Sequence, residues 1–243
     1  MVFARTVRSR LILVGLAVAP LLAAPQAPAQ RGRGIFVTPI PGAPFVGEVS
    51  VERTVIQADG KTVTVHTSHM IARDSEGRIR NEVRAFQPAG ATGTPPLIRV
   101  HLYDPQTRLT SYLNPRDRTF WVDAVDHPPA TDAPDAYASP AGSDAPPSQF
   151  AGEKDLGTRT IAGMEVHGVR ETQTIPGAAS GTGQDMVVTD EYWYSYDLKM
   201  NLAVTHTDPR TGSVTMTVTL LSRAEPDASL FTVPADYQSA VGR

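Results

Sequence analysis

Apolar and polar residues alternate with a period of two along most of the chain after Val46. In the first such run, Val49 and Val51 would share one face of a strand and Ser50 the other. Turns such as Ala58-Asp59-Gly60 separate the runs, which is typical of strands joined in hairpins. We expect strands at residues 46–55, 62–71, 78–85, 97–103, 109–113, 119–125, 158–161, 166–174, 186–196, 202–207 and 213–222.

Helical periodicity is almost absent, since no window of useful length has apolar residues at i, i+3, i+4 and i+7. One short helix is expected at Pro226–Phe231, with proline in its first turn. The predicted fold is therefore mainly β, a curved antiparallel meander of about ten strands forming a half-barrel, with little helix. Such a sheet must curl or pack on itself to cover its apolar face.

The N-terminal segment has the pattern of a secretory signal peptide. Arg5, Arg8 and Arg10 precede the apolar run 11–22, and Ala27-Pro28-Ala29 is a small-residue cleavage site. The apolar run is too short for a membrane span. We expect cleavage after Ala29 and a soluble protein in the periplasm or outside the cell.

The remaining chain is expected to form one domain with a long internal loop. Residues 30–45 are rich in Gly and Pro and predict an extended arm. Residues 46–237 form the predicted single antiparallel β domain, and 238–243 a tail. A Pro-, Ala- and Asp-rich segment, 126–149, interrupts the domain and predicts a flexible loop.

Composition excludes several classes of protein. The chain has no cysteine, which excludes a disulfide scaffold, thiol catalysis and lipid attachment through an N-terminal cysteine. Its net charge of −3 disfavours nucleic acid as a partner. No segment after the signal reaches the length of a transmembrane helix, so no membrane span is expected after cleavage.

No motif indicates an enzyme, a metal site or a cofactor. His66 and His69 would point to opposite faces of one strand, as would Asp190 and Glu191, so neither pair predicts a joint site. A Gly-x-Ser-x-Gly elbow is absent. Four arginines on one hairpin alternate with Glu76 and Glu82, which predicts a solvated, salt-bridged face: Arg73, Arg78, Arg80 and Arg84.

The aromatic residues offer two interpretations. Two dense groups, Phe120-Trp121 and Tyr192-Trp193-Tyr194, lie in the middle of expected strands. Large aromatic side chains commonly form cores, but they also line apolar grooves in β proteins. On the second interpretation the groove would be lined by Phe120, Trp121, Trp193 and Met216.

Several short motifs together resemble a known family. They are Gly77-Arg78-Ile79-Arg80-Asn81-Glu82, Tyr103-Asp104-Pro105, Glu191-Tyr192-Trp193 and the closing Ser229-Leu230-Phe231-Thr232-Val233-Pro234-Ala235-Asp236-Tyr237. Over most of residues 46–237 the chain resembles uncharacterised secreted bacterial proteins related to the outer-membrane lipoprotein carrier (LolA-like) superfamily. The resemblance implies a curved antiparallel half-barrel with an apolar concave face, and relatives that bind lipid chains or act as envelope sensors.

Three functions stay open at this level. The first is a binding protein that holds a lipid or other apolar or amphiphilic ligand on the concave face. The second is a non-enzymatic interaction or sensor module with a filled core and a protein partner in the envelope. The third is an enzyme whose site has no recognisable motif. An open groove would favour the first and a filled interior the second.

Overall fold

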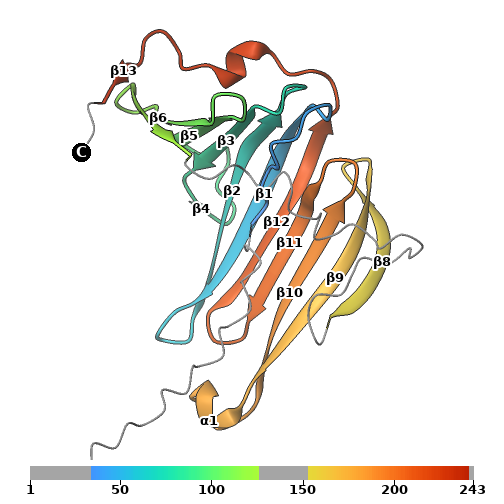
Figure 1. The fold of residues 1–243 in the computed structure, drawn as a ribbon. Coiled ribbons are helices and arrows are strands. Elements are labelled where there is room, and N and C mark those ends of the chain that lie inside the picture. The colour runs from blue at the N-terminus through green and yellow to red at the C-terminus, as the bar shows by residue number, and fades with distance from the viewer. Residues whose placement is uncertain (1–33, 126–152, 241–243) are drawn as a thin grey trace, which may run out of the picture. The chain divides into compact units, whose positions relative to one another are not determined.

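The computed structural model describes residues 34–125 and 153–240. The predicted signal peptide and the Pro-rich loop 126–149 lie outside these residues. The described residues form one large, curved, unclosed sheet (Figure 1). Its long strands are antiparallel, which confirms the predicted fold class.

The sheet has thirteen strands in the described residues. Their bounds are β1 Phe45–Ile56, β2 Thr62–Arg73, β3 Ile79–Arg84, β4 Gln87–Pro88, β5 Leu97–Asp104, β6 Leu109–Asn114, β7 Thr119–Ala124, β8 Lys154–Ile161, β9 Met164–Ile175, β10 Met186–Ser195, β11 Met200–Asp208, β12 Gly212–Ser222 and β13 Gln238–Ser239. The spatial order is β13-β7-β6-β5-β3-β2-β1-β12-β11-β10-β9-β8, with β4 beside β2. The first and last long strands of the meander, β1 and β12, therefore pair at its centre.

Three short elements were not predicted from the sequence pattern, and a fourth was. Strands β4 and β13 have two residues each, and β13 pairs in parallel with β7. A single helical turn, α1 (Gly177–Ser180), lies in the loop before β10. The expected C-terminal helix is a 3₁₀ turn, η1 (Ala228–Phe231), capped by the carboxylate of Asp227, which accepts from the Ser229 amide at 2.8 Å.

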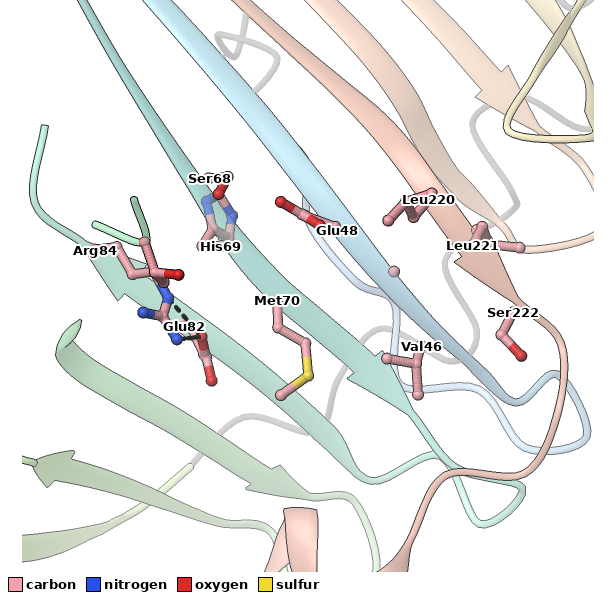
Figure 2. Close-up of a pocket in the computed structure, with 12 residues that line it drawn as sticks. Val46, Glu48, Ser68, His69, Met70, Glu82, Arg84, Leu220, Leu221 and Ser222 are labelled. Atoms are coloured by element: carbon pink, nitrogen blue, oxygen red, sulfur yellow. Dashed lines mark hydrogen bonds and ion pairs between the residues drawn. The ribbon is translucent and has the colours of Figure 1, made fainter. Parts of the chain in front are cut away.

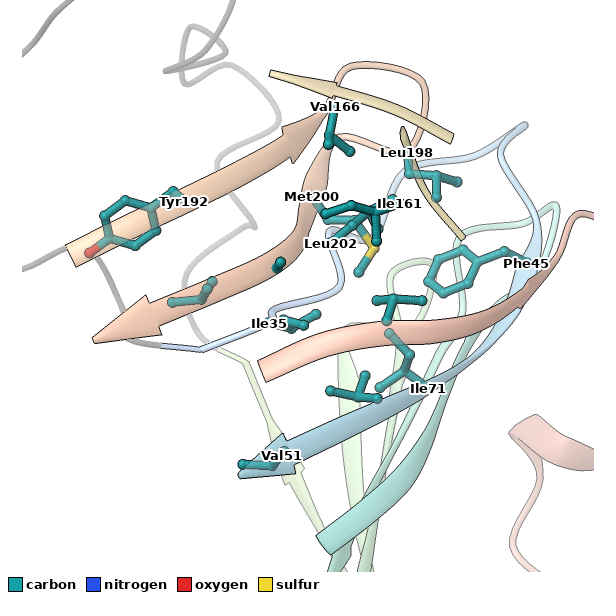
Figure 3. Packing of buried hydrophobic residues seen from close by; sticks show 14 residues of the cluster. Ile35, Phe45, Val51, Ile71, Ile161, Val166, Tyr192, Leu198, Met200 and Leu202 are labelled. Atoms are coloured by element: carbon teal, nitrogen blue, oxygen red, sulfur yellow. The ribbon is translucent and has the colours of Figure 1, made fainter. Parts of the chain in front are cut away.

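The main hydrophobic core joins the centre of the sheet to its β8–β11 end. It includes Phe45, Val49 and Val51 of β1 together with Leu202 and Val204 of β11 (Figure 3). We call the side of the central strands that carries Val49 and Val51 the core face. The arm adds Ile35 to this cluster, so residues before the sheet help to fill its core.

A second, smaller cluster lies on the opposite face of β5–β7. It consists of Val100, Leu102 and Leu113, with Phe120 packed against them. Val233 and Tyr237 of the C-terminal segment cover it. The sheet therefore buries apolar side chains on different faces in its two parts.

This change of face explains an error in the expected alternation of β3. The sequence pattern places Val83 on the covered face and Glu82 in solvent, but Val83 is 43% exposed and Glu82 only 4%. Arg80, beside Glu82, donates to the Leu230 carbonyl at 3.2 Å, so the C-terminal segment lies over this face. Residues distant in sequence thus decide which side of β3 is buried.

Arg73 corrects the predicted solvated arginine face. Its side chain is completely buried at the end of β2. Nε donates to the Ala43 carbonyl at 2.9 Å, and Nη1 to the carbonyls of Thr38 and Leu198 at 2.7 and 3.0 Å. Its guanidinium carbon lies 5.2 Å from the centre of the Phe45 ring. Arg73 therefore links the arm, β2 and the β10–β11 turn.

Candidate functional site

A largely apolar groove of about 570 Å³ crosses β12, β1, β2 and β3. Val46, Met70 and Leu220 provide its apolar surface (Figure 2). Thr94 from the loop before β5 also lines it. The volume falls within the range of small-molecule sites. Leu220 is 65% exposed and is the most exposed large aliphatic side chain in the described residues.

A β-bulge gives this groove its local geometry. Glu48 pairs with Leu220 on β12, whereas the next residue, Val49, pairs with Val218. One extra residue of β12, Thr219, is therefore inserted at this point. Bulges bend a strand and redirect the neighbouring side chains, which accounts for the exposed Leu220 beside the well-packed Val218.

An ion cluster forms the polar edge of the groove. Glu82 accepts from Arg80 Nη2 at 3.0 Å and from Arg84 Nε at 2.9 Å. Arg84 Nη1 also donates to the Pro95 carbonyl at 2.9 Å, which ties the loop before β5 to β3. The charge of a buried carboxylate is compensated when two guanidinium groups bind it. This ion cluster therefore forms a well-ordered polar boundary of the groove.

Two other ionisable groups line the groove. Burial lowers the pKa of His69, with the charge of Glu82 acting in the opposite sense, so this imidazole is neutral at pH 7. Glu48 is half-buried, and its carboxylate has no hydrogen-bond or ion-pair partner among the described residues. In Figure 2 it lies between Met70 on β2 and Leu220 on β12.

The four residues predicted to line a groove divide between the two faces of the sheet. Met216 pairs with Val51 and therefore shares the core face. Following the cross-strand pairs from β7 to β1 shows that Trp121 also lies on the core face. Phe120 is its neighbour along β7 and therefore points to the opposite face. Trp193 pairs with Ala203, which pairs with Thr217 and so lies on the opposite face. Contact of these residues with a ligand stays a prediction.

Trp121 ends a row of stacked rings. His101 and Tyr112 are stacked with ring centres 5.0 Å apart, and Tyr112 and Trp121 are separated by the same distance. These three residues occupy directly opposed positions on β5, β6 and β7. Since Trp121 is 36% exposed, the row presents an aromatic surface on the core face.

The indole ring of Trp193 contacts a glycine on the neighbouring strand and a guanidinium group. A Cβ added to Gly168 on β9 would meet the indole ring at 2.5 Å, so only glycine permits this packing. The Arg159 guanidinium lies 3.7 Å from the centre of the same ring, which is a cation–π contact. Trp193 and Arg159 line a second hollow of about 550 Å³ whose other surface is rich in threonine. It is a more polar space than the groove around Leu220.

Most of the other acidic and histidine side chains noted in the sequence have separate partners. Asp190 contacts His206 Nδ1 at 2.7 Å, and Glu191 contacts Arg170 Nη2 at 2.6 Å. Asp190 and Glu191 therefore have separate partners and form no joint site, as the alternation along the strand predicts. The described residues hold no group of three acidic, histidine or cysteine side chains that could bind a metal. They also contain no helix with the length and hydropathy needed to cross a membrane.

The sequence analysis did not predict the groove around Leu220, because the only sequence feature that marks it is an interruption of the apolar–polar alternation. Leu220 and Leu221 are adjacent apolar residues at the end of a strand that otherwise alternates. Two such residues in sequence point to a bulge when their partner strand is known. The partner, β1, is distant in the chain, so the pairing could not be inferred from β12 alone.

Comparison with solved structures finds distant similarities of fold. A protein from Thermus thermophilus, described as an uncharacterized conserved protein, is 10% identical with a TM-score of 0.39, covering 82% of this chain and 90% of that one. MucB from Pseudomonas aeruginosa, in its complex with MucA, is 16% identical with a TM-score of 0.37, covering 80% and 57%. A LolA superfamily protein from Nitrosomonas europaea is 11% identical with a TM-score of 0.28, covering 79% and 91%.

A LolA superfamily protein is thus among the structures found, as the sequence resemblance predicted, and the likeness concerns the fold alone. No family model matches the chain. No curated protein matches it either. The function must therefore be argued from the groove itself.

Proposed function

We propose that this protein binds an apolar or amphiphilic ligand in the groove around Leu220. The observation that carries the proposal is an exposed leucine in a mainly apolar groove whose opposite side is bounded by the Glu82 ion cluster. Exposed apolar surface of this kind gains free energy when a ligand removes it from water. The Glu82 cluster bounds the groove on one side, which suits a ligand with one apolar and one polar end.

The N-terminal pattern of basic residues, apolar run and small-residue site supports action in the periplasm or outside the cell.

The groove proposed here lies in a different place from the groove expected from the sequence. The core face is filled around Val49 and Ile35, whereas the open space lies on the other side of β1 and β2. Binding here requires no catalytic group, and we propose a non-enzymatic role.

Substitution of Leu220 tests this function directly. Leu220→Asp introduces a charge into the apolar surface, and because the side chain is exposed we expect little effect on folding. Val122→Asp is a matched control, since Val122 is 45% exposed and does not line the groove. We expect Leu220→Asp to weaken binding of dodecyl maltoside, measured by isothermal titration below its micellar concentration, by about tenfold or more. Equal binding by wild type and both variants would refute the groove as the site.

The exposed aromatic row gives a second candidate, a protein-interaction module. Trp121 presents a large ring at the surface of β7, and tryptophan is enriched at the centres of protein interfaces. Under this alternative the protein would bind a partner in the envelope through β5–β7 and carry no ligand. Cross-linking from a photoreactive residue placed at Asp123, an exposed position on the same face of β7 as Trp121, would identify such a partner.

A further inference from the structure

We propose that Glu48 makes the groove selective for amphiphiles whose polar end is cationic. This inference rests on the proposed function and adds the chemical class of the ligand. It follows from the position of one carboxylate, from the state of the charges around it and from the surface on which it lies.

Glu48 stands between two apolar residues. Its directly opposed neighbours are Met70 on β2 and Leu220 on β12. Both line the groove, and Glu48 lines it with them (Figure 2). Opposed side chains on neighbouring strands lie close enough to interact, but neither a thioether nor a leucine compensates a carboxylate. The fold therefore places a negative charge on the apolar floor without supplying a partner.

The cations near the groove are already engaged. Arg84 is held by Glu82 and by the Pro95 carbonyl. Arg80 is held by the same carboxylate and by the Leu230 carbonyl. His69 is kept neutral by burial. Glu82 is compensated by the two arginines, so Glu48 is the uncompensated charge among the described residues that line the groove.

A ligand would complete this arrangement. An ammonium or guanidinium group at the end of an apolar chain would pair with Glu48 while the chain covers Met70 and Leu220. An anionic group at the same place would be repelled by the Glu48 carboxylate. This repulsion would be strengthened because the bound ligand displaces water from the surface. The groove should therefore rank three chain-matched ligands in the order cationic, neutral, anionic.

Three dodecyl probes test this order in the full-length protein. Dodecyltrimethylammonium, dodecyl maltoside and dodecyl sulfate share the apolar chain and differ in charge. Binding is measured by isothermal titration below the micellar concentration of each probe, at low and at moderate salt. We expect the cationic probe to bind best, with an advantage that decreases as salt is added.

Glu48→Gln supplies the decisive variant, since it keeps the size of the side chain and removes its charge. We expect it to weaken the cationic probe by about fivefold, the effect of one ion pair at a half-exposed site, and to leave the maltoside unchanged. Glu52→Gln is the matched control, because Glu52 is an exposed residue of the same strand outside the groove lining. Circular dichroism verifies that both variants are folded.

The outcomes separate the two proposals. Binding of dodecyl maltoside without any preference for the cationic probe overturns the role of Glu48 and leaves the groove as an apolar site. Tighter binding of dodecyl sulfate, or an equal loss in Glu48→Gln and Glu52→Gln, overturns it as well. Failure of all three probes to bind overturns the proposed function together with this inference.

Discussion

Arg73 provides the sharpest test of how this fold is held together. Replacing it with methionine keeps a long, flexible side chain but removes three hydrogen-bond donors. The carbonyls of Ala43 and Leu198 then lose the donor that Arg73 supplies, and the Thr38 carbonyl keeps only the Ile40 amide. These three groups belong to the arm and to the β10–β11 turn, so the substitution should loosen the connection between them and β2.

The magnitude follows from two opposing terms. A hydrogen bond from a charged donor contributes about 1.5–3 kcal/mol, so three contribute roughly 5–9 kcal/mol. Against this, burial lowers the pKa of Arg73 to about 10, which corresponds to a cost of up to about 3 kcal/mol for keeping the charge out of water. Methionine removes both terms. The expected net loss of unfolding free energy is about 2–6 kcal/mol, a large part of the stability of a single domain.

Urea denaturation followed by circular dichroism measures this loss. Arg99→Met is the matched control, since Arg99 is an exposed residue of β5 for which ordinary surface behaviour is expected. We expect Arg73→Met to shift the midpoint strongly and Arg99→Met to change the unfolding free energy by less than about 0.5 kcal/mol. A loss below about 1 kcal/mol in Arg73→Met would show that the buried hydrogen bonds do not outweigh the desolvation of the guanidinium.

Two further substitutions test local features of the sheet. Hydrogen bonds from Arg210 lower the pKa of Asp208 to about 2, so its contribution to stability is present above pH 4 and is lost as the pH falls toward 2. The difference in unfolding free energy between wild type and Asp208→Asn should therefore shrink by up to about 2 kcal/mol between pH 7 and pH 2, and a constant difference would contradict this. Gly168→Ala should cost about 1–3 kcal/mol, because its methyl group would displace the Trp193 ring. An unchanged midpoint together with unchanged tryptophan fluorescence would show that the ring does not lie on Gly168.

The long strands could be predicted from the sequence because their alternation is local. Val49 and Val51 are buried and Ser50 is exposed, as the pattern of β1 indicates. The same is not true of β3, where Glu82 is buried and Val83 exposed. A period of two shows that a strand has two different faces, but the C-terminal segment, which is distant in sequence, determines which face of β3 is covered.

The candidate site could be predicted only in its general nature. Sequence reasoning proposed an apolar groove and placed aromatic side chains in it, because these are the largest apolar groups in the chain. The groove found in the structure depends instead on the pairing of β1 with β12 and on the bulge opposite Glu48. Arg73 shows the same limit, since nothing local distinguishes it from the exposed arginines that follow it in the sequence.

Native mass spectrometry of the protein purified from its own cell envelope tests the central claim most directly. The spectrum is recorded before and after extraction with organic solvent, and the extract is analysed for small molecules. We predict a stoichiometric excess of mass that disappears on extraction and corresponds to an amphiphile, and this excess should be absent from Leu220→Asp and retained in Val122→Asp. A mass equal to that of the polypeptide alone, in a stably folded protein, would contradict ligand binding and favour the interaction module.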